Sequence, residues 1–142
     1  MSREEISIKA IDCILYNRRL WRESVELLEA QTSASVVAIP LLRAPGDPVG
    51  SVAVARATIT QVLDVVDKAI RSLPREHRRI AKLKWERSMT HNEIADAINY
   101  SLSTVERRVA IIRKSVKAHL AAMDEEILTE FWGEIEGILR GY

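Results

Sequence analysis

The chain has 142 residues, of which 29% are charged and 47% hydrophobic, and its formal net charge is +1. This length fits one domain with a real core, and the single cysteine, Cys13, excludes a scaffold held by internal disulfides. There is no apolar run of about 18 residues and the charged N-terminus is not typical of a secretory signal, so we expect a cytoplasmic protein with no membrane partner.

The small net charge conceals a strong asymmetry along the chain. Residues 71–120 carry 12 Lys and Arg against 5 Asp and Glu, whereas residues 121–142 carry 1 against 6. A basic middle segment favours a polyanionic partner, and the acidic tail must serve another purpose.

Residues 3–30 contain no Gly or Pro and predict an amphipathic helix. Its apolar positions recur at spacings of three, four and seven: Ile11, Ile14, Trp21, Val25 and Leu28. Arg18 falls on the same stripe and interrupts it. Two alternatives stay open, a helix packed on its own domain and a helix paired with a second copy of the chain.

Residues 31–50 hold three of the four prolines and predict a linker, which would leave the first helix as a separate arm. Ser51 then resembles the N-cap of a helix over residues 52–73. The expected domains are therefore an N-terminal helical arm with its linker (1–50), a central domain (51–123) and an acidic amphipathic C-terminal helix (124–142). Asp124 would cap the last of these.

Pro74 is suited to open a helix over residues 74–87, because a proline in the first turn lacks only an NH that would be unbonded anyway. A second helix is predicted after Thr90. Thr90 and Glu93 have the spacing of a capping box, so a helix should begin at His91 and bury Ile94, Ala95 and Ile98. Asn99 tolerates the left-handed conformation that ends a helix. Trp85 and Tyr100 are expected to provide packing bulk rather than base stacking.

Ser101 can cap a further helix over residues 101–120, whose apolar stripe is Val105, Val109, Ile112, Val116, Leu120 and Met123. This stripe could pack against the helix over 52–73 or against another chain. A short helix, a tight turn and a second helix with exposed polar residues at its start form a helix-turn-helix, which inserts its second helix into the DNA major groove. The predicted fold class is all-α, a helical domain built around this motif.

Side-chain chemistry divides the candidate DNA contacts into two sets. Arg can bind guanine through two acceptors and Glu can accept from cytosine, so the expected base-reading residues are Ser103, Thr104, Glu106 and Arg107. Cations on both helices, and the two helix caps, are expected at backbone phosphates. These are Arg75, Arg78, Arg79, Lys82, Thr90, Ser101, Arg108, Arg113 and Lys114.

The segment "SLPREHRRIAKLKWERSMTHNEIADAINYSLSTVERRVAIIRKSVKAHL", residues 72–120, resembles region four of bacterial sigma factors. The shared features are a leucine-proline start, a Ser/Thr-capped "EIA" helix and an "S-x-S-T-V-x-R-R" recognition helix. Asn99 stands where that family usually has Gly. The layout of the whole chain is similar to phage transcriptional regulators of the RinA/ArpU type, which are associated with activation of late or packaging genes.

The resemblance implies a transcriptional regulator that binds double-stranded DNA. It does not assign the acidic tail, for which three alternatives stay open: packing on the domain, a subunit contact, and a surface that contacts RNA polymerase. We expect a homodimer, because one such unit reads only a few base pairs. Three scattered histidines without zinc spacing and no Gly-rich phosphate loop give no support for an enzyme, a metal or a cofactor. Two alternatives remain: a DNA-packaging subunit similar to a small terminase, and a polymerase-docking module without specific DNA recognition.

Overall fold

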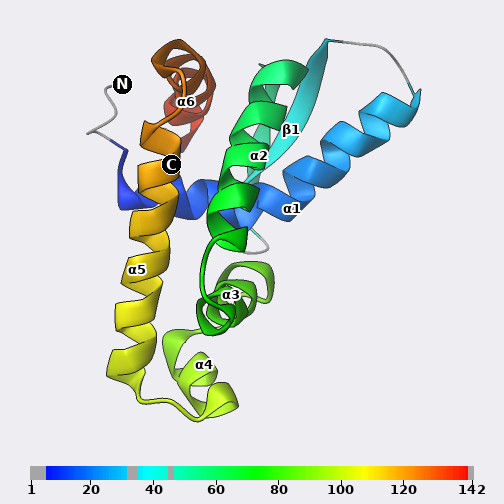
Figure 1. The fold of residues 1–142 in the computed structure, drawn as a ribbon. Helices are drawn as coiled ribbons and strands as arrows, with labels where there is room; N and C mark the ends of the chain where they lie inside the picture. The colour runs from blue at the N-terminus through cyan, green and yellow to red at the C-terminus, as the bar shows by residue number, and fades with distance from the viewer. Residues whose placement is uncertain (1–5, 32–34, 45–46, 141–142) are drawn as a thin grey trace.

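The computed structural model describes residues 6–31, 35–44 and 47–140, which are mostly helical with one two-stranded sheet (Figure 1). α5 stands beside α2, and α1 runs across both of them. The elements in chain order are α1 (Ile8–Gln31), β1 (Val36–Ala44), β2 (Asp47–Ala55), α2 (Arg56–Arg71), α3 (Arg75–Ala81), a π-helical turn η2 (Lys82–Glu86), α4 (His91–Ile98), α5 (Leu102–Ala121) and α6 (Glu125–Arg140).

The linker prediction for residues 31–50 is wrong, because most of this segment belongs to an antiparallel hairpin of β1 and β2. Alternate residues are buried, and Ile39 lies opposite Val52, as expected for a sheet with one covered face. Both strands of a two-stranded sheet are edges, which tolerate proline where its missing NH is not needed. The helix expected from Ser51 begins instead at Arg56, because residues 52–55 complete β2.

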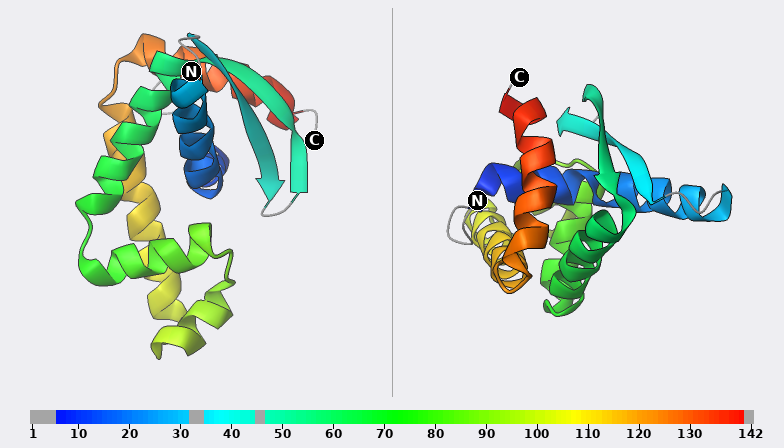
Figure 2. Two further views of the ribbon diagram at one scale, coloured as in Figure 1. Left: turned by 90° about the vertical axis from the view of Figure 1, so that its right-hand side faces the viewer. Right: turned by 90° about the horizontal axis from the view of Figure 1, so that it is seen from above.

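α1 packs on its own chain and is not a separate arm. It contacts β1, α2 and α5, and Figure 2 shows the hairpin lying against its C-terminal half. Trp21 is fully buried; its ring meets Phe131 of α6 edge-on with centroids 5.8 Å apart, and its indole NH donates to the Pro40 carbonyl. One side chain of α1 therefore contacts both the hairpin and α6.

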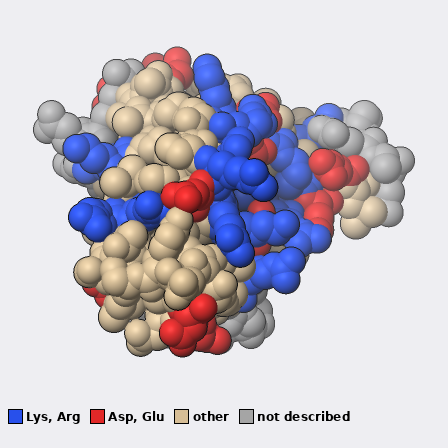
Figure 3. All heavy atoms as spheres, turned by 60° about the horizontal axis from the view of Figure 1, so that its bottom comes forward, with Lys and Arg blue, Asp and Glu red and all other residues tan. Residues whose placement is uncertain are grey.

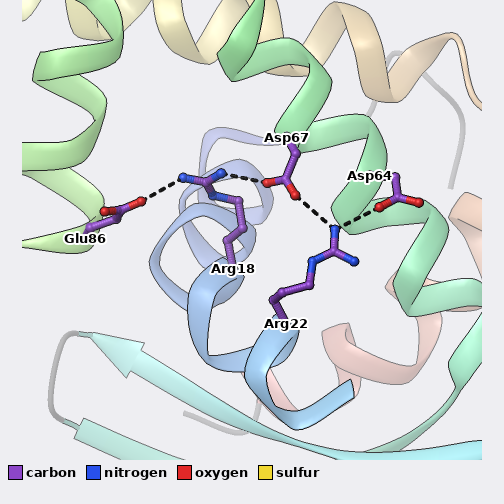
Figure 4. A network of polar contacts seen from close by, with 5 residues as sticks. All are labelled: Arg18, Arg22, Asp64, Asp67 and Glu86. Atoms are coloured by element: carbon purple, nitrogen blue, oxygen red, sulfur yellow. Dashed lines mark hydrogen bonds and ion pairs between the residues drawn. The ribbon is translucent and has the colours of Figure 1, made fainter. Parts of the chain in front are cut away.

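Arg18, the interruption in the apolar stripe, is used for ion pairing. It contacts Asp67 of α2 at 2.6 Å and Glu86 of η2 at 3.1 Å (Figure 4). Arg22, one turn later, contacts Asp67 and Asp64, each at 2.9 Å. The side chains are about one quarter exposed or less except at Asp64, so the chain of pairs lies at the edge of the α1–α2 contact.

The central core forms where α2, α5 and α6 converge. The apolar stripe of α5 packs against α2, the first of the two alternatives expected for it. Asp124 accepts from the Glu126 NH at 2.8 Å, which confirms the predicted cap ahead of α6. The buried residues of the three helices include Ile59, Val62, Leu63, Val66, Val105, Val109, Ile112, Val116, Leu120, Leu128, Phe131 and Ile135.

Candidate nucleic-acid interface

α4 begins with the capping box that the sequence predicts. The Glu93 NH donates to Thr90 Oγ1 at 3.2 Å, and the Thr90 NH donates to the Glu93 carboxylate at 2.9 Å. The hydrogen bond from the Thr90 NH to the carboxylate holds the pKa of Glu93 below its usual value. Ile94 and Ala95 are buried as expected, whereas Ile98 is only partly buried.

The turn between α4 and α5 depends on one left-handed residue. Asn99 has φ 57° and ψ 45°, and the next NH, that of Tyr100, donates to the Ala95 carbonyl at 3.0 Å. The Ser101 hydroxyl then accepts from the Thr104 NH at 3.2 Å, so α5 begins at Leu102. Three residues are therefore enough to redirect the chain and start a second helix.

The first two turns of α5 present most of the expected base-reading residues to solvent. Ser103, Glu106 and Arg107 are exposed, while Val105 on the opposite side is fully buried. Thr104 is partly covered, and its hydroxyl lies 3.3 Å from the Arg107 guanidinium. The structure thus brings all four expected base-reading residues together on one end of one helix.

Leu102 is an exposed apolar residue beside this group, with 39% of its surface accessible. Leu102 is not among the expected DNA contacts. Its spacing of three from Val105 places it at the start of the apolar stripe of α5, yet it is exposed whereas Val105 is fully buried.

His91 lies next to Glu106, with Nδ1 4.0 Å from the carboxylate. Burial lowers the pKa of His91, and the positive charges of Lys84 and Arg113 lower it further. The neighbouring Glu106 carboxylate opposes this shift but does not reverse it, so the protonated imidazole is disfavoured.

The expected phosphate-binding residues of α3 and η2 are exposed and adjacent. Arg75, Arg78, Arg79 and Lys82 line an open concavity, together with Glu76. Figure 3 shows Lys and Arg gathered over this end of the molecule, with few acidic groups among them. Lys114 of α5 is exposed as well. Arg87 and Lys117 are also exposed and belong to the same basic segment, although they are not among the expected phosphate contacts.

Two of the expected phosphate ligands are instead engaged within the chain. Arg113 binds Asp12 of α1 through two nitrogens, at 3.0 and 2.9 Å. Arg108 binds Glu76 at 2.7 Å and lies over the Tyr100 ring, 4.6 Å from its centroid. The sequence could not indicate these partners, since each lies on another helix.

Thr90 and Ser101 serve as caps, and both side-chain oxygens accept from helical NH groups. Trp85 is buried and donates to Asp12 at 3.3 Å, while Tyr100 is partly buried beneath Arg108. Trp85 is therefore a packing residue, as predicted, whereas Tyr100 packs against the core with only part of its surface.

Within the described ranges, no group of His, Cys, Asp and Glu has the arrangement of a metal site, and no helix is long and apolar enough to cross a membrane. Comparisons with protein-family models, with curated proteins and with solved structures find no match for this chain. The site must therefore be interpreted from its own geometry and chemistry.

Proposed function

We propose that the chain is a sequence-specific DNA-binding transcriptional regulator, in which α4 and α5 form a helix-turn-helix that resembles sigma factor region four. The observation that carries the proposal is the exposed start of α5. Ser103, Glu106 and Arg107 face solvent there, while Val105 anchors the opposite side in the core. Such an arrangement lets a helix enter the major groove without unpacking.

The charged side chains of α5, α3 and η2 would divide the DNA contacts between base edges and backbone. The start of α5 would read base edges, with Arg107 suited to guanine and Glu106 suited to the cytosine amino group. The cations of α3 and η2 would contact the flanking backbone, which orients the protein without reading sequence. Arg78, Arg79 and Lys82 are exposed for this purpose.

The regulator we propose acts in the cytoplasm as a homodimer, similar to phage activators of the RinA/ArpU type. Two copies would read two half-sites, because one helix-turn-helix contacts only a few base pairs. RNA polymerase is a further proposed partner, for which the exposed acidic residues Glu125, Glu126 and Glu130 of α6 are the candidate surface.

Enrichment of a randomised duplex library by the purified full chain at physiological salt tests the proposal, with Arg107→Ala run in parallel. We expect a defined motif, with half-sites about 10 base pairs apart or a multiple of this spacing. Arg107→Ala should lose preference at one position of each half-site. Retention of DNA without enrichment would contradict sequence-specific binding and favour the packaging or polymerase-docking alternatives. The number of copies in the assembly would then separate these two, because a packaging subunit would form a ring of many copies.

A further inference from the structure

Glu76, in the first turn of α3, makes two polar contacts outside its own helix, with 58% of its side chain exposed. The Tyr100 hydroxyl donates to one carboxylate oxygen at 2.7 Å, and the Arg108 guanidinium donates to the other at 2.7 Å. Arg108 also lies over the Tyr100 ring. Glu76, Tyr100 and Arg108, which we call the clip, thus connect α3, the turn before α5, and α5 itself in one closed set of contacts.

We infer that the clip fixes the position of the reading helix relative to the basic helix, so that Glu76, Tyr100 and Arg108 are positioning residues for base discrimination. The inference rests on the proposed function. Base contacts by α5 are selective only while α3 holds the DNA backbone in a matching register. A binding site loses selectivity when its supporting contacts allow movements of about half an ångström.

The location of the clip supports this role. Glu76 directly follows Arg75 and lies one turn before Arg79, both expected at phosphates. Arg108 directly follows Arg107, the expected guanine reader. A displacement at either end of the clip therefore moves a phosphate contact relative to a base contact.

The clip also accounts for an acidic residue on a basic surface. An unpaired carboxylate among Arg75, Arg78 and Arg79 would repel a DNA backbone. Both oxygens of Glu76 are occupied by donors, and these hydrogen bonds hold the pKa of Glu76 below its usual value. The same contacts raise the pKa of Arg108, whose charge is directed at Glu76.

The competing role for Arg108 is direct binding of a phosphate, and a double-mutant cycle separates the two. The affinity of the full chain would be measured for its selected duplex and for a scrambled duplex of equal length, over a series of salt concentrations. The variants are Glu76→Ala, Arg108→Ala, the double variant, and Arg79→Ala as a matched arginine outside the clip. Thermal unfolding of each variant confirms that it is folded, and Glu76→Gln replaces Glu76→Ala if that variant does not fold.

We expect Glu76→Ala and Arg108→Ala each to lower the ratio of specific to scrambled affinity by about threefold to tenfold, and the double variant to lower it no further. Tyr100→Phe, which keeps the ring beneath Arg108, should retain more discrimination than either. Arg79→Ala should lower the affinity for both duplexes equally. A purely structural role would change the unfolding midpoint and leave the affinity ratio unchanged.

Two results would overturn the inference. In the first, Arg108→Ala lowers the affinity for both duplexes and lowers the salt slope even in the Glu76→Ala background. This result would identify Arg108 as a phosphate ligand. In the second, all clip variants discriminate like the wild type. If the wild type itself shows no preference, the proposed function fails, and this outcome is recognised before any variant is compared.

Discussion

Arg113 of α5 holds both carboxylate oxygens of Asp12 of α1, at 3.0 and 2.9 Å, across a sequence separation of 101 residues. The same carboxylate accepts from the Trp85 indole at 3.3 Å, and the guanidinium lies 5.9 Å from the centre of that ring. Both charged side chains are about three quarters buried. Helix α1 is thereby fastened to the helix that carries the candidate DNA contacts.

Replacement of Arg113 should affect stability rather than DNA binding. Arg113→Ala leaves the Asp12 carboxylate without its charged partner and should lower the free energy of unfolding by about 1.5–3 kcal/mol, as measured by urea denaturation. Lys114→Ala, which alters an exposed residue of the same helix, is the control and should leave stability nearly unchanged. On DNA, Lys114→Ala should reduce the salt slope by about one, whereas equal reductions in both variants would restore Arg113 to the phosphate-binding set.

Arg107 and Arg79 should differ in the kind of binding they provide. Arg107→Ala should cost about 1–3 kcal/mol of discrimination at one base pair, because a bidentate contact to guanine is lost. Arg79→Ala should weaken binding to all sequences similarly and lower the salt slope by about one. Titrations of matched and mismatched duplexes at several salt concentrations measure both quantities. Arg107 leaves the reading set if its variant keeps the wild-type preference.

Asn99 should tolerate glycine but not alanine. Its φ of 57° lies in the left-handed region, where a Cβ that lacks a polar side chain costs about 1–2 kcal/mol. Asn99→Ala should therefore lower the free energy of unfolding, measured by urea denaturation, by about that amount. Asn99→Gly should remain close to the wild type. Asn92→Ala, an exposed position within α4, is the matched control. Equal loss in the alanine variants at 92 and 99 would mean that the turn conformation is not limiting.

His91 should make the folded state sensitive to acid. Burial lowers its pKa from the usual 6.5, so the unfolded chain binds a proton at a pH where the folded chain does not. The contribution to stability is therefore complete above about pH 6.5 and is lost as the pH falls through the folded pKa. Unfolding free energies measured between pH 7.5 and about 5 should fall less steeply for His91→Gln than for the wild type. Parallel curves would exclude His91 as a source of the dependence.

The sequence could predict α4, the start of α5 and the start of α6, because their signals are local. Thr90, Ser101 and Asp124 satisfy NH groups within three residues of themselves, and Asn99 determines the turn by its own backbone conformation. The exposed start of α5 follows from the same local spacing. No distant residue is needed to infer it.

The hairpin and the internal ion pairs depend on distant parts of the chain. Pro40 and Pro48 suggested a loop, although Val37, Ile39 and Leu41 alternate as strand residues do. The strand forms because α1 covers the apolar face of the hairpin, and the local sequence does not show this. In the sequence, Arg113 cannot be distinguished from a solvent-exposed cation, because its partner Asp12 lies on a distant helix. Charge alone could not show which arginines remain free for a phosphate.

The contact between Trp21 and Phe131 has a consequence for the order of folding. A ribosome completes α1 long before it makes α6, so the side of Trp21 that Phe131 covers is expected to stay open until late in synthesis. The hairpin, made next, can shield part of that face through the Pro40 carbonyl and its buried strand residues. The hairpin of β1 and β2 would thus act as an early cover for α1, and α6 would complete the enclosure.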